Sequence, residues 1–325
     1  MAIEVVKPGL LTTLQDLGRA GHAHLGIGRA GAFDVPAMRI ANALCGNPGD
    51  ACGLEMTLLG PTLRFDAGTW IAVTGAPMAI DLEGTECPMW APVFVPAGAS
   101  VTLGAVRAGC RSYLGVGGGV DVEPVLGSRS TDLNAELGPH SGRPLGVGDT
   151  LASGTDTGDA EPATPKWRLD PRPWYFEDSS KPLRLLPGNH LDRLTTISRK
   201  QLFSDDFTVH TDSNRVGVRL AGPTLECSAP IEMISEGFVP GLLQLPPSGQ
   251  PIAFGPECPV SGGYPRLGTI AAVDIPRLAQ LRPGDALRFR ACTMDEASDA
   301  LRKRERALDE LEAAIRHRLS RGDRH

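Results

Sequence analysis

Residues 233–268 read MISEGFVPGLLQLPPSGQPIAFGPECPVSGGYPRLG. Two short apolar runs in this stretch, 242–245 and 251–254, flank Pro246-Pro247-Ser248-Gly249, which is a strong turn signal. Short apolar runs bounded by glycine and proline are typical of β-strands joined by tight loops. The loops carry several polar side chains, and glycine beside such groups lets the backbone approach a ligand closely. An ordinary set of polar β-turns on a globular core is the alternative interpretation.

The composition extends this β-rich interpretation to the whole chain. Glycine (39) and proline (28) together make 67 of the 325 residues, well above average usage. Further short apolar runs follow one another closely between residues 54 and 103, as in a sandwich or barrel. The formal net charge of −6 argues against a nucleic-acid surface, which needs clustered positive charge. No stretch approaches the roughly 20 apolar residues of a spanning helix, and no signal peptide is visible.

The cysteines indicate a reducing compartment. There are seven, an odd number, and no two form a C-x-x-C pair, which argues against a disulfide framework or a zinc knuckle. We therefore expect reduced thiols, a cytoplasmic protein and no metal site. Cys258 lies in a polar loop, but a lone cysteine is more often an inert small residue than a nucleophile.

An internal repeat predicts the domain organisation. Three short matches recur in the same order: Gly60–Leu63 with Gly222–Leu225, Leu114-Gly115 with Leu267-Gly268, and Gly148–Leu151 with Gly284–Leu287. An ordered set of this kind favours two related β domains. We expect one domain at 1–151, a linker at 152–182, a second domain at 183–292 and a C-terminal helix at 293–325.

The two copies differ by one insertion. The first copy carries 17 more residues between Asp121 and Asp149 than the second carries between Asp274 and Asp285. The additional residues include the donor-rich run 127–132, GSRSTD. A polar insertion in a common scaffold is a natural place for function, and a surface loop without a role is the alternative.

Local signals predict two helices and one hairpin. Asp34 is a good N-cap for a helix that has Pro36 in its first turn and ends at Gly46. Residues 294–319 form one long helix with an apolar stripe, which lies on a domain surface or, alternatively, binds a partner. Residues 54–57 and 62–65 flank Leu59-Gly60-Pro61 in a hairpin-like pattern.

Five ordered motifs carry a family resemblance. They are TTLQDLGRxG at 12–21, GAFD and RIANxLxGN within 31–47, LExTxxGPxL at 54–63, LGSRSTD at 126–132, and the SEG, GLLQLP, GQPI and GGYP segments of 235–265. Together they resemble the biotin-dependent carboxyltransferase family. That family includes the C subunit of 5-oxoprolinase, allophanate hydrolase subunit 2, the KipI antagonist and a part of urea carboxylase. The resemblance covers about residues 1–292.

The resemblance implies two cyclophilin-like β-barrel domains, in agreement with the repeat. It also implies a complex with two further 5-oxoprolinase subunits, the KipI-like B subunit (allophanate hydrolase subunit 1) and the A subunit. Such a complex opens 5-oxoproline, a lactam, to glutamate using ATP. Other members imply carboxyl transfer from carboxybiotin to urea, or binding of a KipI-like kinase inhibitor without chemistry.

The resemblance also raises the question of cofactors. No GxxxxGK[ST] is present, so an ATP site would be of another type and could be shared with a partner. Arg39 follows Met38 where a biotin-acceptor motif has lysine, so we expect no biotin on this chain.

A small amide or lactam substrate needs donors aimed at its oxygen and a group that moves a proton. We predict catalytic roles for Arg129, Asp132, Glu236 and Tyr264, and substrate-binding roles for Arg29, Asp34, Arg215, Gln244 and Glu257. Arginine would polarise the carbonyl, a carboxylate would take a proton, and Gln244 with Tyr264 would orient a planar compound.

Each of these residues also has a structural interpretation. Arg215 would pair with Asp212, Asp132 and Asp34 would cap helices, Glu236 would hold a turn, and Tyr264 would belong to the core. Two places depart from the family pattern and leave the substrate open. Glu257 stands where aspartate is usual and is followed by Cys258-Pro259-Val260-Ser261 in place of a polar run, and Asn214 stands where an S-D-R motif has aspartate.

Overall fold

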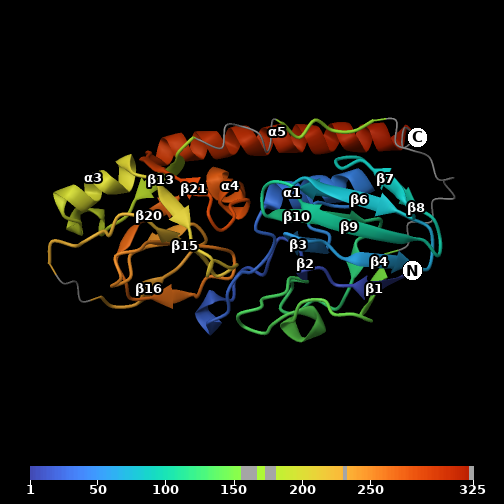
Figure 1. The fold of residues 1–325 in the computed structure, drawn as a ribbon, viewed down its shortest axis with the longest axis horizontal. Helices are drawn as coiled ribbons and strands as arrows, with labels where there is room; N and C mark the ends of the chain where they lie inside the picture. The colour runs from blue at the N-terminus through green and yellow to red at the C-terminus, as the bar shows by residue number, and fades with distance from the viewer. Residues whose placement is uncertain (155–166, 173–180, 230–232, 322–325) are drawn as a thin grey trace. The chain divides into compact units, whose positions relative to one another are not determined.

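The structure, a computed structural model, describes residues 1–154, 167–172, 181–229 and 233–321. Its residues divide into two compact units (Figure 1). The first unit contains Met1–Arg19, Ala30–Glu177 and Ala307–His325, and the second contains Ala20–Arg29 and Asp178–Arg306. Most of the predicted linker, 152–182, lies outside the described residues.

Two antiparallel sheets form the first unit. The seven-stranded sheet has the order β11 (Val120–Asp121), β12 (Thr150–Ser153), β1 (Ala2–Lys7), β4 (Thr62–Phe65), β9 (Ser100–Val106), β6 (Met78–Leu82) and β7 (Thr85–Cys87). The five-stranded sheet has the order β2 (Leu11–Gln15), β3 (Gly53–Thr57), β10 (Arg111–Val116), β5 (Thr69–Gly75) and β8 (Val93–Val95).

The hairpin expected at 54–57 and 62–65 is wrong, because β3 and β4 belong to different sheets. Leu58 has a positive φ of 62°, and Leu59 bridges Ala105 in β9. The Gly60 N–H also donates to the Gly104 carbonyl at 3.2 Å. The chain therefore crosses to the seven-stranded sheet instead of reversing beside β3.

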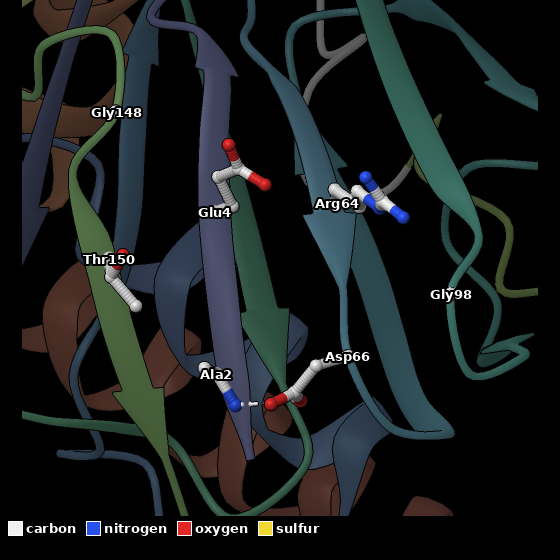
Figure 2. A pocket seen from close by; sticks show the side chains of 7 residues that line it. All are labelled: Ala2, Glu4, Arg64, Asp66, Gly98, Gly148 and Thr150. Atoms are coloured by element: carbon white, nitrogen blue, oxygen red, sulfur yellow. Dashed lines mark hydrogen bonds between the residues drawn. The ribbon is translucent and has the colours of Figure 1, made fainter.

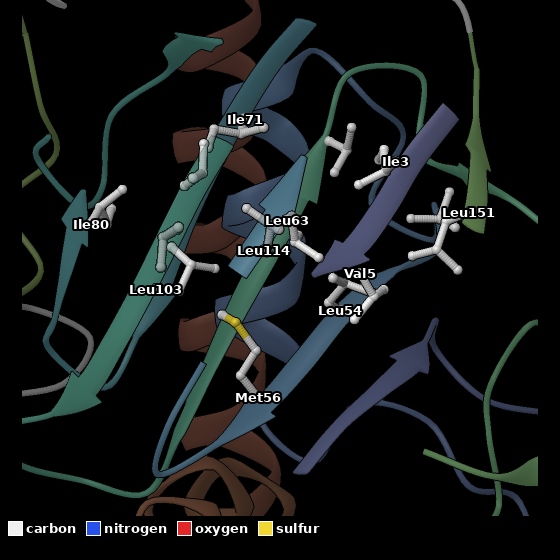
Figure 3. Packing of buried hydrophobic residues seen from close by; sticks show 14 of the residues in the cluster. Ile3, Val5, Leu54, Met56, Leu63, Ile71, Ile80, Leu103, Leu114 and Leu151 are labelled. Atoms are coloured by element: carbon white, nitrogen blue, oxygen red, sulfur yellow. The ribbon is translucent and has the colours of Figure 1, made fainter. Parts of the chain in front are cut away.

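Apolar residues of both sheets make one core, shown in Figure 3. In β1 the side chains of Ile3 and Val5 are buried while Glu4 is exposed, as expected for a strand with one face on the core. Strand β10 is buried at every position, so the five-stranded sheet is covered on its other face too. Each fully buried aliphatic side chain contributes about 1.5–3 kcal/mol to folding.

Helix α1 (Val35–Cys45) packs against β5 and β10 of the five-stranded sheet. Its predicted signals are confirmed: the Asp34 carboxylate accepts a hydrogen bond from the Ala37 N–H at 3.2 Å, and Gly46 ends the helix with a φ of 79°. The Thr74 hydroxyl donates to the Ala37 carbonyl at 2.7 Å and ties the helix to β5.

Helix α5 (Met294–Ser320) is the predicted C-terminal helix, and residues from 307 onward belong to the first unit. Leu308 and Ile315 are buried in a cluster with Ile40 of α1 and with Trp167. Because the chain itself covers this part of the apolar stripe, the interpretation of α5 as a helix lying on a domain surface is supported.

Polar contacts hold α5 in the same place. Arg39 of α1 pairs with Asp309 at 2.9 Å and with Glu312 at 2.7 Å. The guanidinium of Arg318 lies 4.7 Å from the centroid of the Trp167 ring, in a cation–π contact.

One eight-stranded sheet dominates the second unit. Its order is β21 (Ala286–Leu287), β14 (Phe207–Val209), β15 (Gly217–Ala221), β18 (Ile252–Phe254), β17 (Leu242–Gln244), β20 (Arg266–Ile270), β13 (Leu183–Pro187) and β22 (Phe289–Ala291). The two end strands, β21 and β22, are separated in the chain only by Arg288, so the sheet curls into a nearly closed barrel. Strands β17 and β18 pair antiparallel, which confirms the strand–turn–strand prediction for 242–254.

Short elements complete both units. They are the two-stranded sheet of β16 (Glu236–Gly237) and β19 (Ser261–Gly262), helices α3 (Thr196–Ser204) and α4 (Ile275–Ala279), and the 3₁₀ turns Ala23–Leu25, Pro139–Gly142, Leu191–Arg193 and Ala272–Asp274. In the described part of the chain no helix is long and apolar enough to cross a bilayer.

The internal repeat is visible in equivalent turns. Gly148 and Gly284 both have positive φ, 83° and 92°, and each precedes an aspartate. Their N–H groups donate to the carbonyls of Val5 and Val209, both at 2.9 Å. Each aspartate then accepts a hydrogen bond from the N–H three residues earlier, at 2.7 Å for Asp149 and 2.8 Å for Asp285. The predicted mainly β fold with an internal repeat and a C-terminal helix is confirmed.

The Leu308→Ala substitution tests how much the α5 packing stabilises the first unit. Leu308 is fully buried, so removing its methyl groups leaves a cavity and should lower stability by about 2–5 kcal/mol. Chemical denaturation should show the change as a lower transition midpoint. The exposed Glu310→Ala on the same helix should leave the midpoint nearly unchanged, and equal midpoints for the two variants would contradict the packing described.

Candidate functional site

The predicted site residues fall into both units. Asp34, Arg129 and Asp132 belong to the first unit. The second unit contains Arg29, Arg215, Glu236, Gln244, Glu257 and Tyr264. The structure places most of them in one polar cluster of the first unit and two of the second, whereas Asp34 and Arg29 lie outside these clusters.

The first cluster surrounds Asp16, which directly follows β2 and is 8% exposed. Four groups donate to its carboxylate: the Gly18 N–H (2.7 Å), the Arg129 N–H (2.6 Å), the Ser128 hydroxyl (2.7 Å) and the Ser130 hydroxyl (2.5 Å). The Asp16 N–H in turn donates to the Ser130 hydroxyl at 3.0 Å. One buried carboxylate therefore holds the 128–130 loop, more than 100 residues away in the chain.

Neighbours of Asp16 strengthen this attachment. The Gln15 side-chain amide donates to the Thr131 carbonyl at 3.0 Å, and a terminal amino group of Arg19 donates to the Ser130 carbonyl. All three residues belong to the TTLQDLGR motif, although sequence analysis proposed no site role for them. The motif itself was the sequence signal for their role: it places polar residues at the end of a strand, and polar residues that become buried there need hydrogen-bond partners.

Arg129 and Asp132 occupy different environments in this loop. The half-buried Arg129 side chain donates from Nε to the Val122 carbonyl at 2.9 Å. Asp132 is buried, and its Oδ1 accepts from the N–H groups of Asn134 (3.1 Å) and Ala135 (3.0 Å). These contacts close a turn. Asp132 therefore has a structural role, but it does not cap a helix as the alternative interpretation had it.

Cys52 contacts the same loop: its Sγ lies 3.9 Å from the Arg129 carbonyl oxygen. Burial, followed by the negative charge of Asp16, raises the pKa of the Cys52 thiol far above its usual range. The thiol therefore stays neutral and is a poor nucleophile.

Asp34 has the contacts of a structural residue. It is fully buried and caps α1, and its N–H donates to the Tyr113 hydroxyl at 2.8 Å. That hydroxyl donates to Glu55 at 2.8 Å, and Glu55 also accepts from the Phe33 N–H at 2.9 Å. Burial and the charge of Glu55 raise the pKa of Tyr113. The glutamate of the LExT motif thus anchors the GAFD segment.

The second cluster surrounds Arg266 of β20. Glu236 of β16 forms an ion pair with the Arg266 guanidinium, which also donates to the Gly237 carbonyl at 3.2 Å. Gln244 of β17 lies opposite Arg266 in the sheet, and its side-chain amide donates to the Tyr264 carbonyl at 3.2 Å. Three predicted residues thus meet around an arginine that the sequence analysis did not single out, although it directly follows GGYP.

The side chains of Tyr264 and His190 complete the description of this Arg266 cluster. The Tyr264 side chain is 48% exposed, so it is not a core residue. The Arg266 N–H donates to Nδ1 of His190 at 3.3 Å. Burial and the positive charges of Arg266 and Arg193 lower the pKa of His190, which keeps its imidazole neutral at pH 7.

A third cluster is a buried ion pair. Arg215 and Glu257 pair at 2.5 Å between Nε and Oε1, with side chains 3% and 1% exposed. Arg215 therefore pairs with Glu257, whereas the alternative interpretation expected Asp212 as its partner. Asn214, the other departure from the family pattern, accepts from the N–H of Val216 at 2.9 Å and shapes the adjoining turn. Arg29 is exposed, in the segment Ala20–Arg29 of the second unit.

Two surface hollows lie apart from these clusters. One, of about 500 Å³, opens on the outer face of the seven-stranded sheet beside Glu4, Arg64 and Thr150 (Figure 2). The other, of about 240 Å³, lies beside His210, Arg219 and Gln250 in the second unit. No predicted site residue lines either hollow. Within the described residues, no group of three His, Cys, Asp or Glu side chains is placed to hold a metal ion.

Comparison with known proteins identifies the family of the chain that carries these clusters. Residues 25–291 match the family described as carboxyltransferase domain, subdomain A and B. This chain belongs to that carboxyltransferase family. Both the 126–132 loop and the Arg266 cluster lie inside the matched range, whereas Asp16 lies just before it.

Individual members of the carboxyltransferase family match nearly the whole chain. The C subunit of Escherichia coli 5-oxoprolinase is 37% identical over 91% of this chain and 93% of its own length. The Haemophilus influenzae protein of the same name is 32% identical with the same coverage. The crystal structure of Kluyveromyces lactis urea amidolyase superposes with a TM-score of 0.84 at 29% identity over 95% of this chain, which spans only 20% of that longer protein.

Breaking the buried ion pair should be costly. The Glu257→Ala substitution removes the carboxylate that pairs with the buried Arg215 charge, and we expect a loss of about 3–5 kcal/mol in unfolding free energy. Chemical denaturation measures it. The control is Asp206→Ala, which removes the partner of Arg288 from an exposed pair and should change the midpoint little. Equal effects of the two variants would show that the Arg215–Glu257 pair is not buried as described.

Proposed function

We propose that this chain is the C subunit of an ATP-dependent 5-oxoprolinase that opens the lactam 5-oxoproline to glutamate together with the B and A subunits. The observation that carries the proposal is the match to the C subunit of the Escherichia coli enzyme, which extends along more than nine-tenths of both proteins. Fold alone would not suffice, since one fold serves many reactions.

The reaction places definite demands on the site. Water adds across the lactam C–N bond, which breaks: the carbonyl carbon gains the oxygen and becomes a carboxylate, and the ring nitrogen gains both hydrogens of the water and becomes an ammonium group. Hydrogen-bond donors are needed for the substrate oxygens, and a carboxylate is needed to move a proton. In the second unit we assign donation to Tyr264 and proton transfer to Glu236. Arg129 of the first unit is a further candidate donor to a substrate oxygen.

The position of Glu236 suits this role. Its side chain is 40% exposed, and its ion pair with Arg266 holds the carboxylate in place. His190 accepts a hydrogen bond from the Arg266 main-chain N–H, and because its pKa is lowered, its neutral imidazole adds no positive charge. Gln244 is buried and holds the main chain at Tyr264, which leaves the exposed Tyr264 ring to meet a ligand.

The remaining parts of the proposal concern partners, cofactor and compartment. The B and A subunits would supply what this chain lacks, including a share of the ATP site. Biotin would not be attached here, because Arg39 stands where the acceptor motif has lysine. We propose a cytoplasmic location because none of the seven cysteines forms a disulfide.

Carboxyl transfer is the second candidate. It is supported by the structural similarity to urea amidolyase, with a TM-score of 0.84. In that case a separate carrier would deliver carboxybiotin, and urea or a related amide would accept the carboxyl group. Binding of a KipI-like inhibitor without chemistry is the remaining alternative and predicts no turnover at all.

The decisive assay measures glutamate release from 5-oxoproline by this chain co-expressed with its B and A subunits, with and without ATP. We expect ATP-dependent glutamate. Glu236→Gln should lower kcat by about 100-fold or more, because the amide cannot take up a proton. Arg129→Ala should lower kcat/KM at least about tenfold, because charge-assisted hydrogen bonds to the substrate are lost.

Matched controls use ion pairs outside the clusters. Glu296→Gln, which loosens the pair with Arg290, and Arg143→Ala, which removes the partner of Asp149, should retain full activity. A well-assembled complex without ATP-dependent turnover would refute the lactamase proposal. Carboxylation of urea by carboxybiotin would then be assayed with the same complex.

A further inference from the structure

We propose that Asp16 is a positioning residue that fixes the 128–130 loop so that the Arg129 guanidinium receives the carboxylate of the substrate. The inference rests on the proposed function and deepens it, since it names the chemical class that the first unit recognises: a small carboxylic acid. It assigns binding to Arg129 and orientation to Asp16, whose own oxygens are already occupied.

The first argument is that the Asp16 carboxylate is committed to the protein. An ionised carboxylate has about four lone-pair sites. Oδ1 accepts from Gly18, Ser128 and Ser130, and Oδ2 accepts from the Arg129 N–H, at distances of 2.5–2.7 Å. Short charge-assisted bonds of this kind are the strong ones. Asp16 is therefore an anchor for the loop and not a proton acceptor for the substrate.

The second argument is that hydrogen bonds fix the main chain and Nε of Arg129, whereas its two terminal amino groups remain available to a ligand. Its main-chain N–H is fixed by Asp16 and its Nε by the Val122 carbonyl at 2.9 Å. Among the described residues, the two terminal amino groups of Arg129 have no hydrogen-bond partner. Because the side chain is only half-buried, these amino groups remain accessible. Because the Arg129 side chain is already fixed at Nε, it loses little further conformational entropy when its terminal amino groups bind a ligand.

The third argument concerns geometry. The planar end of a guanidinium offers two parallel N–H donors, which match the two oxygens of a carboxylate better than a single carbonyl oxygen. 5-Oxoproline carries a carboxylate beside the lactam nitrogen, whereas 2-pyrrolidinone is the same ring without it. Urea also has no carboxylate. Arg129 would thus select the acid among compounds that share an amide.

The test compares the assembled complex with 5-oxoproline and with 2-pyrrolidinone, in steady-state kinetics and in equilibrium binding without ATP. Arg129→Ala should raise the KM and the dissociation constant for 5-oxoproline about 10- to 100-fold, with a smaller change in kcat. Its affinity for 2-pyrrolidinone should not change. Arg129→Lys should not restore bidentate binding, whereas added guanidinium at low, non-denaturing concentration should partly rescue Arg129→Ala.

Asp16→Asn tests the positioning role. It should raise the KM for 5-oxoproline about tenfold with little change for 2-pyrrolidinone, and it should have no further effect when added to Arg129→Ala. Ser128→Ala removes one donor to Asp16 and buries no new charge, and it should also raise the KM for 5-oxoproline. It replaces Asp16→Asn in the test if that variant does not fold. Asp149→Asn is the control, because this loop aspartate also accepts a main-chain N–H but lies outside the cluster.

The outcomes separate this inference from the proposed function. Turnover with KM values that Arg129→Ala and Asp16→Asn leave unchanged would overturn the inference and keep the function. Arg129-dependent binding of 5-oxoproline without turnover would support the inference and refute the function. A purely structural role for Asp16 would lower stability and affect both compounds equally, which also overturns the inference. Absence of both binding and turnover would overturn both.

Discussion

The need to pair strand edges sets the architecture of this chain. An unpaired edge exposes a row of main-chain donors and acceptors, and a curled sheet removes that exposure by bringing its ends together. In the second unit the ends of the eight-stranded sheet are β21 and β22, which are separated only by Arg288. In the first unit two sheets enclose one apolar core instead. The turns at Gly148 and Gly284 repeat the same main-chain pairing in both units. A rigid β framework of this kind can hold polar loops in fixed positions.

Buried carboxylates attach those loops to the framework. Asp16 holds the 128–130 loop, Glu55 holds the GAFD segment, and Asp274 binds both the main chain and the side chain of Arg184. A buried charge is tolerated only when donors surround it, so each of these residues restricts the loops near it to few conformations. The clusters differ in what they leave accessible. Tyr264 is exposed and Arg129 is half-buried, whereas Asp34 caps α1 and Asp132 closes a turn.

Sequence analysis predicted some residues of the candidate site and missed others. The missed residues are those whose partners lie far away in the chain. It placed Glu236, Gln244 and Tyr264 in neighbouring loops, and the structure brings them together. It did not single out Arg266 or Asp16 as site residues, because their importance comes from partners that are distant in the chain. Glu257 was considered for substrate binding, yet its partner is Arg215, 42 residues away. The hairpin at 54–65 failed for the same reason, since a Gly-Pro turn between strands is compatible with reversal or with a crossing to another sheet.

The sequence by itself determined the β-rich class, the internal repeat, the caps of α1, the extent of α5 and the family. These follow from local signals, namely glycine and proline at turns, a capping aspartate, a helical apolar period and ordered motifs. Only the tertiary structure decided which strands share a sheet, which carboxylate holds which loop, and which arginines are engaged. Pairings of this kind depend on contacts across 40 to more than 100 residues, as between Arg215 and Glu257 or Asp16 and Ser130. No local pattern encodes them, because many polar residues could satisfy the same buried charge and only the fold brings particular ones within reach.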